Sequence, residues 1–171
     1  GAGCAGVAPP LTAAGEGQVG ELAASLSAHL TEIELVVVSP LTRALQTATG
    51  ALAGSPAPFM LNGRLRERLG APCDTGRSRS ELLRDFPSLG SWLGHDALDE
   101  VWWTRSFVEW RVPERVEEFR KWLSARPEQC IAVVGHGAFF QLLIGGRKLR
   151  NCGVQWVEWK APDSFERVAA A

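Results

Sequence analysis

Two short apolar runs of this sequence are each followed by a side chain that binds anions. Residues 131–134 lead into His136, which lies between two glycines, and residues 35–38 lead through Ser39 to Arg43. If both runs are parallel strands of one sheet, both side chains project from its carboxyl edge, where open α/β sheets bind their ligands. An imidazole and a guanidinium at that edge favour an anionic ligand, most simply a phosphate.

Each of these side chains also lies where a helix is expected to begin. The free N–H groups and the positive dipole end of a helix stabilise a bound anion. We expect His136, as an imidazolium, to donate to a phosphoryl oxygen, and Gly137 to let the backbone approach the ligand. A cation at such a helix end is unfavourable, so a bound anion would resolve the conflict at Arg43. The alternatives are a histidine that caps its helix or bonds to the core, and an arginine paired with a glutamate.

A third group of candidates lies in an irregular, arginine-rich segment at residues 62–80. Glu67 or Asp74 would act as a general acid at a phosphate site if its pKa were raised. Arg66 would widen the anion-binding rim, and a solvated charged loop is the alternative for the whole segment. The tryptophan-rich tract at residues 88–113 would line a pocket for an organic leaving group or, as we prefer, pack over the sheet edge.

The elements that would position these groups alternate between helical and strand patterns. Apolar residues at helical spacing predict amphipathic helices, and continuous β-branched runs predict strands buried on both faces. Helices are expected at 13–30 after the N-cap Thr12, from Pro40 to Leu52, after Arg79 or Ser80 through Asp85, and at 114–125 and 138–144; strands are expected at 35–38, 59–61, 131–134 and 154–159. This alternation predicts an α/β fold with a mostly parallel sheet, in one domain over residues 1–171.

Composition narrows the functions that remain. A net charge of −1 offers no basic field for nucleic acid or an anionic membrane. No apolar run approaches the ~20 residues of a membrane span, and no signal-peptide pattern occurs. The cysteines form no C-x-x-C pair, which argues against a zinc ribbon and for reduced thiols in a cytoplasmic protein. With three histidines in the chain, a metal site built from a histidine cluster is not expected.

Several segments, in order, resemble the histidine phosphatase superfamily, also called phosphoglycerate mutase-like. Pro-Leu-Thr at 10–12 resembles the entry to that family's first helix, and Val-Val-Ser-Pro-Leu-Thr-Arg-Ala-Leu-Gln-Thr-Ala at 37–48 resembles its most diagnostic internal segment. Leu-Arg-Glu at 65–67 and Val-Val-Gly-His-Gly at 133–137 resemble the segments of its proton donor and its second catalytic histidine. Pro-Cys-Asp-Thr-Gly at 72–76 is similar to a branch found in plants, algae and fungi.

The resemblance implies a three-layer α/β/α sandwich and a phosphomonoester hydrolase that forms a phosphohistidine on the way to hydrolysing a small phosphorylated metabolite. No cofactor and no metal are implied. The implied site has His136 and Arg43 as catalytic and phosphate-binding residues, Glu67 as the proton donor, Ser39 and Gly137 around the substrate, and Asp74 and Arg66 close by.

One departure from the family's pattern concerns the nucleophile. In the family it is the histidine of an Arg-His-Gly triplet that ends the first strand, and this sequence contains no such triplet. We therefore expect an N-terminally incomplete domain that lacks its first central strand, with the nucleophile upstream of Gly1, and a chain that is inactive by itself.

Other interpretations stay open. The chain would be a non-catalytic family member that binds a phosphorylated ligand or partner if the triplet is truly absent from the protein. Phosphoglycerate mutase-type phosphoryl transfer is a further alternative, although a mutase must hold its intermediate away from water and nothing in the sequence indicates that. An unrelated α/β domain with chance matches is the remaining one.

Overall fold

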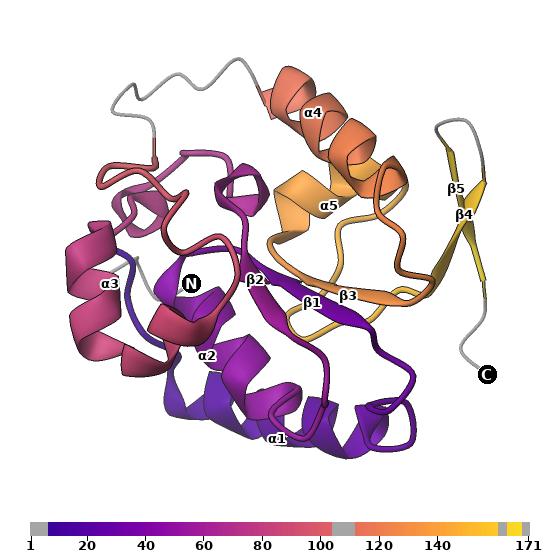
Figure 1. Ribbon diagram of the computed structural model, residues 1–171, viewed down its shortest axis with the longest axis horizontal. Coiled ribbons are helices and arrows are strands. Elements are labelled where there is room, and N and C mark those ends of the chain that lie inside the picture. Colours follow the sequence, from indigo (N-terminus) through magenta and orange to yellow (C-terminus); the bar gives the residue numbers. More distant parts are fainter. Residues whose placement is uncertain (1–6, 104–111, 161–163, 169–171) are drawn as a thin grey trace.

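The computed structural model describes residues 7–103, 112–160 and 164–168, and its centre is a three-stranded parallel sheet (Figure 1). The strand order is β2-β1-β3, with β1 at Leu35–Val38, β2 at Phe59–Leu61 and β3 at Ile131–Val134. All three strands were expected at these positions. Because Val38 pairs with Val134, the carboxyl ends of β1 and β3 lie side by side.

Helices cover both faces of this sheet, which confirms the three-layer α/β/α sandwich. In Figure 1, α1 (Ala13–Leu26) and α2 (Thr42–Ala51) lie below the strands. The helices α4 (Val112–Ser124) and α5 (Gly137–Ile144) lie above them. Each layer packs its helices against one another as well as against the sheet.

The central strand β1 divides its side chains between two hydrophobic cores. Val36 and Val38 pack into the core under α1 and α2, whereas Leu35 and Val37 pack into the core under α4 and α5. This is the alternation that a strand buried on both faces requires. All four side chains are fully buried, so β1 is the most rigidly packed support for whatever follows it.

The helices differ from the sequence prediction mainly at their ends. Thr12 caps α1 as expected, since its hydroxyl accepts from the Gly15 N–H at 3.2 Å, but the helix ends at Leu26 instead of residue 30. The second helix begins at Thr42 with Leu41 as its N-cap, so Pro40 precedes the helix instead of opening it. Its apolar stripe, which helical spacing places on one face, is buried throughout: Leu41, Leu45, Ala48 and Leu52.

Residues 62–103, which follow β2, are mostly irregular. This described stretch contains the short helix α3 (Arg79–Asp85) and short 3₁₀-helices at Gly63–Leu65, Pro72–Asp74 and Pro87–Ser91. Trp92 and Trp102 are buried in the core under α1 and α2, which confirms packing as the role of these two tryptophans. Trp110, which belongs to the same predicted tract, lies outside the described residues.

The C-terminal strand prediction needs correction. A single strand was expected at 154–159, whereas the structure has a separate antiparallel pair, β4 (Val157–Lys160) and β5 (Ser164–Arg167). Among the described residues, β3 pairs with β1 along one edge and with no strand along the other. Its four residues are all half-buried, in contrast to the fully buried β1.

Candidate active site

The two strand-to-helix junctions meet at the carboxyl edge of the sheet, as the sequence predicted. Ser39 follows β1 and its N–H donates to the Val134 carbonyl at 3.0 Å. His136 follows β3 as the N-cap residue of α5, and its Nε2 lies 2.8 Å from Ser39 Oγ. Ser39 is fully buried and His136 is 6% exposed. Because both partners are fixed by neighbouring strands, the imidazole is held in one orientation.

The environment of His136 disfavours its charged form. Burial is the largest cause, followed by the positive charges of Arg43 and Arg115, and together they lower the pKa of His136 well below 6.5. His136 is therefore a neutral imidazole here, whereas the sequence led us to expect an imidazolium. A phosphate dianion beside it would offset this shift, because a nearby negative charge favours the protonated ring.

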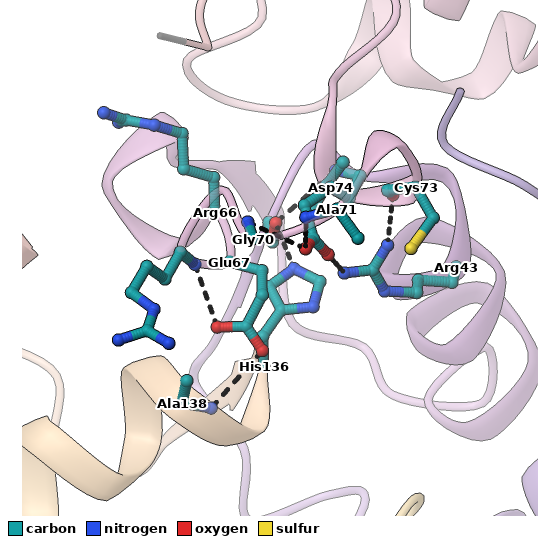
Figure 2. Close-up of polar contacts among 12 residues, drawn as sticks. Arg43, Arg66, Glu67, Gly70, Ala71, Cys73, Asp74, His136 and Ala138 are labelled. Atoms are coloured by element: carbon teal, nitrogen blue, oxygen red, sulfur yellow. Dashed lines mark hydrogen bonds and ion pairs between the residues drawn. The ribbon is translucent and has the colours of Figure 1, made fainter. Parts of the chain in front are cut away.

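Arg43 is held by the loop that follows β2 (Figure 2). Its Nη1 donates to the Cys73 carbonyl at 2.8 Å, and its Nη2 donates to Asp74 Oδ1 at 3.0 Å. The other carboxylate oxygen of Asp74 accepts the backbone N–H groups of Gly70 and Ala71. Arg43 is thus paired with a carboxylate, but the partner is an aspartate of the candidate site instead of the glutamate that the alternative supposed.

Glu67 reaches from the same loop to the other junction. Its Oε2 accepts the Ala138 N–H at the start of α5 at 3.3 Å, and its Oε1 accepts the Arg68 N–H at 2.9 Å. A carboxylate is stabilised by the positive end of the helix dipole at that place. Figure 2 shows Glu67 beside His136 and Arg66 pointing away from both, with its guanidinium bonded to the Gly63 carbonyl. The structure therefore brings Glu67 to the site and leaves Arg66 outside it.

Gly137 allows a close approach at the same edge. A Cβ atom on this residue would lie 2.5 Å from Cε of Lys148, so the lysine side chain passes directly over its backbone. Lys148 is exposed and was not a candidate in the sequence. It places a cation beside the N-terminus of α5.

The residue that sequence analysis missed is Arg115 on α4. It is 6% exposed, and its Nη1 donates to the carbonyls of Arg64 and Arg66, each at 2.6 Å. A signal was present: Val112, Arg115, Val116 and Phe119 occupy one helical stripe, and its other three members are buried apolar residues. A charged residue in an apolar stripe indicates a buried cation that needs hydrogen-bond partners. The stripe does not show which groups those partners are.

A cavity of about 1070 Å³ joins these groups. Arg43, Glu67, His136, Gly137 and Lys148 line one part of it. The rest runs along β3 towards α1 and the segment at residues 149–157. The lining combines cations, a neutral imidazole and a carboxylate, which is a set that can bind an anion and move a proton.

Metal binding, disulfide bonding and membrane spanning are three further properties that the described residues inform. None of their His, Cys, Asp and Glu side chains gather in groups of three or more that could hold a metal ion. Cys73 is disulfide-bonded, so the expectation of reduced thiols throughout is wrong at this position, whereas Cys130 and Cys152 are free. Within the described part of the chain, no helix has the length and apolar character needed to cross a membrane.

Fold and site together define an α/β protein with a pocket lined by Arg43, Glu67 and His136 at the carboxyl edge of its sheet. The chain belongs to the histidine phosphatase superfamily, branch 1, whose family model matches residues 3–160. It is 32% identical to a phosphoglycerate mutase-like protein of Arabidopsis thaliana, over 67% of this chain and 54% of the relative. Phosphoglycerate mutase-like protein 1 of the same plant is 31% identical, over 63% and 49%. The chain thus spans about half the length of these relatives.

Solved structures share the fold at lower identity. A putative α-ribazole-5'-P phosphatase from Escherichia coli superposes with a TM-score of 0.68 at 22% identity, covering 98% of this chain and 89% of the other. A mycobacterial glucosyl-3-phosphoglycerate phosphatase superposes with a TM-score of 0.58 at 17% identity, covering 94% and 87%. At these identities the likeness establishes the architecture.

Proposed function

We propose that the protein is a phosphomonoester hydrolase that acts through a phosphohistidine intermediate on a small phosphorylated metabolite. The observation that carries this proposal is the meeting of Arg43, His136 and Glu67 at one sheet edge. A guanidinium and an imidazole suit the oxygens of a phosphoryl group, and a carboxyl group beside them suits proton transfer to a leaving oxygen. The phosphatase names of the structural neighbours support the same class.

The proposed mechanism has two steps. In the first, a histidine attacks phosphorus in line, the P–O bond to the leaving group breaks, and the carboxyl group of Glu67 protonates the departing alkoxide. Arg43 and His136 stabilise the charge on the phosphoryl oxygens. In the second step, the Glu67 carboxylate takes a proton from water, which attacks phosphorus and releases phosphate from the histidine. Glu67 and the nucleophile thereby return to their starting states.

The attacking histidine is expected outside the described residues. His29 bonds to Glu32 and His95 bonds to the Trp92 carbonyl, so neither is directed at Arg43. The half-buried strand β3 borders the cavity along its length and leads to His136. A strand seated in this cavity would pair with β3 and deliver an Arg-His-Gly triplet next to His136. We propose that the full-length protein supplies that strand.

The test is hydrolysis of p-nitrophenyl phosphate by the full-length protein and by its His136→Ala variant. We expect the variant to lose turnover by orders of magnitude, with His95→Ala, outside the cavity, as a control that keeps it. Acid quenching during turnover should trap an acid-labile phosphoprotein. Near-normal turnover of His136→Ala would refute the role of His136.

Two alternatives have their own outcomes in this test. A protein that binds phosphate and hydrolyses no phosphomonoester would be a non-catalytic family member. A protein that moves phosphate between positions of a phosphoglycerate without releasing it would be a mutase, the interpretation suggested by the names of the plant relatives.

A further inference from the structure

The buried cation of α4 is not used by the proposed mechanism. Arg115 lies among Leu65, Val116 and Phe139, and its guanidinium carbon is 5.3 Å from the centre of the Phe139 ring. A buried charge is costly unless hydrogen bonds satisfy it, and an apolar side chain of similar size would fill such a space more readily. The presence of an arginine at this position therefore calls for a role besides packing.

Two hydrogen bonds of Arg115 are directed at the loop that carries Glu67. One acceptor is the carbonyl of Arg66, which belongs to the peptide group immediately before Glu67. Another is the carbonyl of Arg64, at the last turn before that peptide. A single nitrogen, Nη1, makes both contacts at 2.6 Å, so the two carbonyls are drawn to one point.

Arg115 also contacts the element that receives the Glu67 side chain. Phe139, under its guanidinium, is fully buried and follows Ala138, whose N–H donates to Glu67 Oε2. Arg115 therefore contacts the peptide group that precedes Glu67 and a residue of the first turn of α5, the helix end that the Glu67 carboxylate contacts.

We propose that Arg115 is a positioning residue for Glu67: its guanidinium holds the Arg66–Glu67 peptide so that the carboxyl group lies at the start of α5 beside the leaving-group oxygen. This inference rests on the proposed function. Proton donation matters for a poor leaving group such as an alkoxide and much less for p-nitrophenolate, which departs without a proton. Loss of Arg115 should therefore act selectively on esters with poor leaving groups.

The experiment compares two substrates in the full-length protein. For Arg115→Lys, kcat/KM for a simple alkyl phosphate should fall about 100-fold, because a positioned general acid contributes roughly 10²–10⁴-fold. The value for p-nitrophenyl phosphate should change little. Equal losses on both substrates, or no loss on either, would overturn the inference.

A matched control is available on the same helix. Arg120 donates to the Leu143 carbonyl and lies 5.9 Å from the centre of the Phe165 ring, and neither contact involves the Glu67 loop. Arg120→Lys should leave the ratio of the two kcat/KM values unchanged. If Arg115→Lys does not fold, as judged by circular dichroism, the comparison is made with Arg115→Gln, whose amide NH₂ group can still donate to a carbonyl.

A second measurement does not depend on activity. Hydrogen exchange of the Arg68 and Ala138 amides, both of which donate to Glu67, should become about ten-fold faster in Arg115→Lys, a change of ~1.4 kcal/mol. Unchanged exchange would overturn the positioning role. If the full-length protein hydrolyses neither substrate, the proposed function fails while the exchange rates still decide the inference about Arg115.

Discussion

The carboxylate of Asp74 joins Arg43 to the backbone of its own loop. One oxygen lies 3.0 Å from Arg43 Nη2, and the other accepts the N–H groups of Gly70 and Ala71 at 3.2 and 3.1 Å. The Asp74 side chain is 14% exposed and that of Arg43 is 27% exposed, so water screens the pair only in part. The pair thus fixes the guanidinium that the proposed mechanism needs.

Asp74→Asn should lower the free energy of unfolding by about 1–3 kcal/mol, since it removes the charge from three hydrogen bonds of a mostly buried carboxylate. Urea unfolding followed by circular dichroism measures the change. Asp85→Asn is the matched control: Asp85 pairs with Arg77 and Arg84 at the surface, where such pairs contribute little. Equal losses of unfolding free energy in the two variants would show that Asp74 contributes no more to stability than a surface aspartate.

Ser39→Ala should destabilise the fold and disturb His136. The alanine leaves a buried imidazole nitrogen without its 2.8 Å partner, at an expected cost of about 1–3 kcal/mol. Nitrogen NMR of the imidazole would report the accompanying change in tautomer population. Ser91→Ala, which removes an exposed hydroxyl bonded to the Ser88 carbonyl, should have almost no effect on either measurement. An unchanged tautomer in Ser39→Ala would mean that Ser39 does not orient His136.

Stability should depend on pH through His136. Burial, Arg43 and Arg115 lower its pKa in the folded protein well below 6.5, the ordinary value that we take for the unfolded chain. Between these two values the unfolded chain binds a proton that the folded protein does not. The contribution of His136 to stability is therefore complete above 6.5 and is lost as the pH falls from there to the folded pKa.

Unfolding free energies measured from about pH 5 to 8 would test this dependence. His136→Gln should flatten the slope below 6.5, whereas His29→Gln, at a half-buried position bonded to Glu32, should retain it. A slope that persists in His136→Gln would assign the dependence to other groups.

Replacing glycine by alanine should change the free energy of unfolding in opposite directions at two positions. Gly94 has φ +73°, and a Cβ atom there would lie 2.8 Å from the Leu61 carbonyl oxygen, a backbone atom that cannot move freely. Gly94→Ala should cost at least about 1–2 kcal/mol, the usual penalty for a left-handed non-glycine residue. Gly17 lies within α1 with no atom within 4 Å of its Cβ position, so Gly17→Ala should stabilise by roughly 0.5–1 kcal/mol. Thermal melts of both variants give the comparison.

The parallel sheet and the meeting of its two junctions followed directly from sequence. The runs before Ser39 and His136 are apolar on both faces, and a strand with that pattern has to lie between two layers of helices. Helix ends were less predictable: α1 stops at Leu26 although apolar spacing continues to Leu30, because spacing describes a face and says nothing of where the chain turns.

The contacts within the site could not be predicted from the sequence. Arg43, Glu67 and Asp74 were all candidates. Which carboxylate pairs with Arg43 depends on the path of an irregular loop, and its sequence has no hydrophobic periodicity from which that path could be predicted. Arg115 was missed because helical spacing assigns the position to the core without saying how a charge is satisfied there. Strand β5 was missed because its four residues, Ser-Phe-Glu-Arg, contain a single apolar side chain and so show no clear strand pattern.

Surface loops usually tolerate insertions and deletions, because their ends are free to adjust. The segment from Glu67 to Asp74 is different, since one carboxylate reaches α5 and the other reaches α2. Adding or removing one residue between them would pull one carboxylate out of reach of its helix. The number of residues in this loop should therefore be as restricted as the identity of core residues is. The loop thereby sets the spacing between the two strand-to-helix junctions of the sheet.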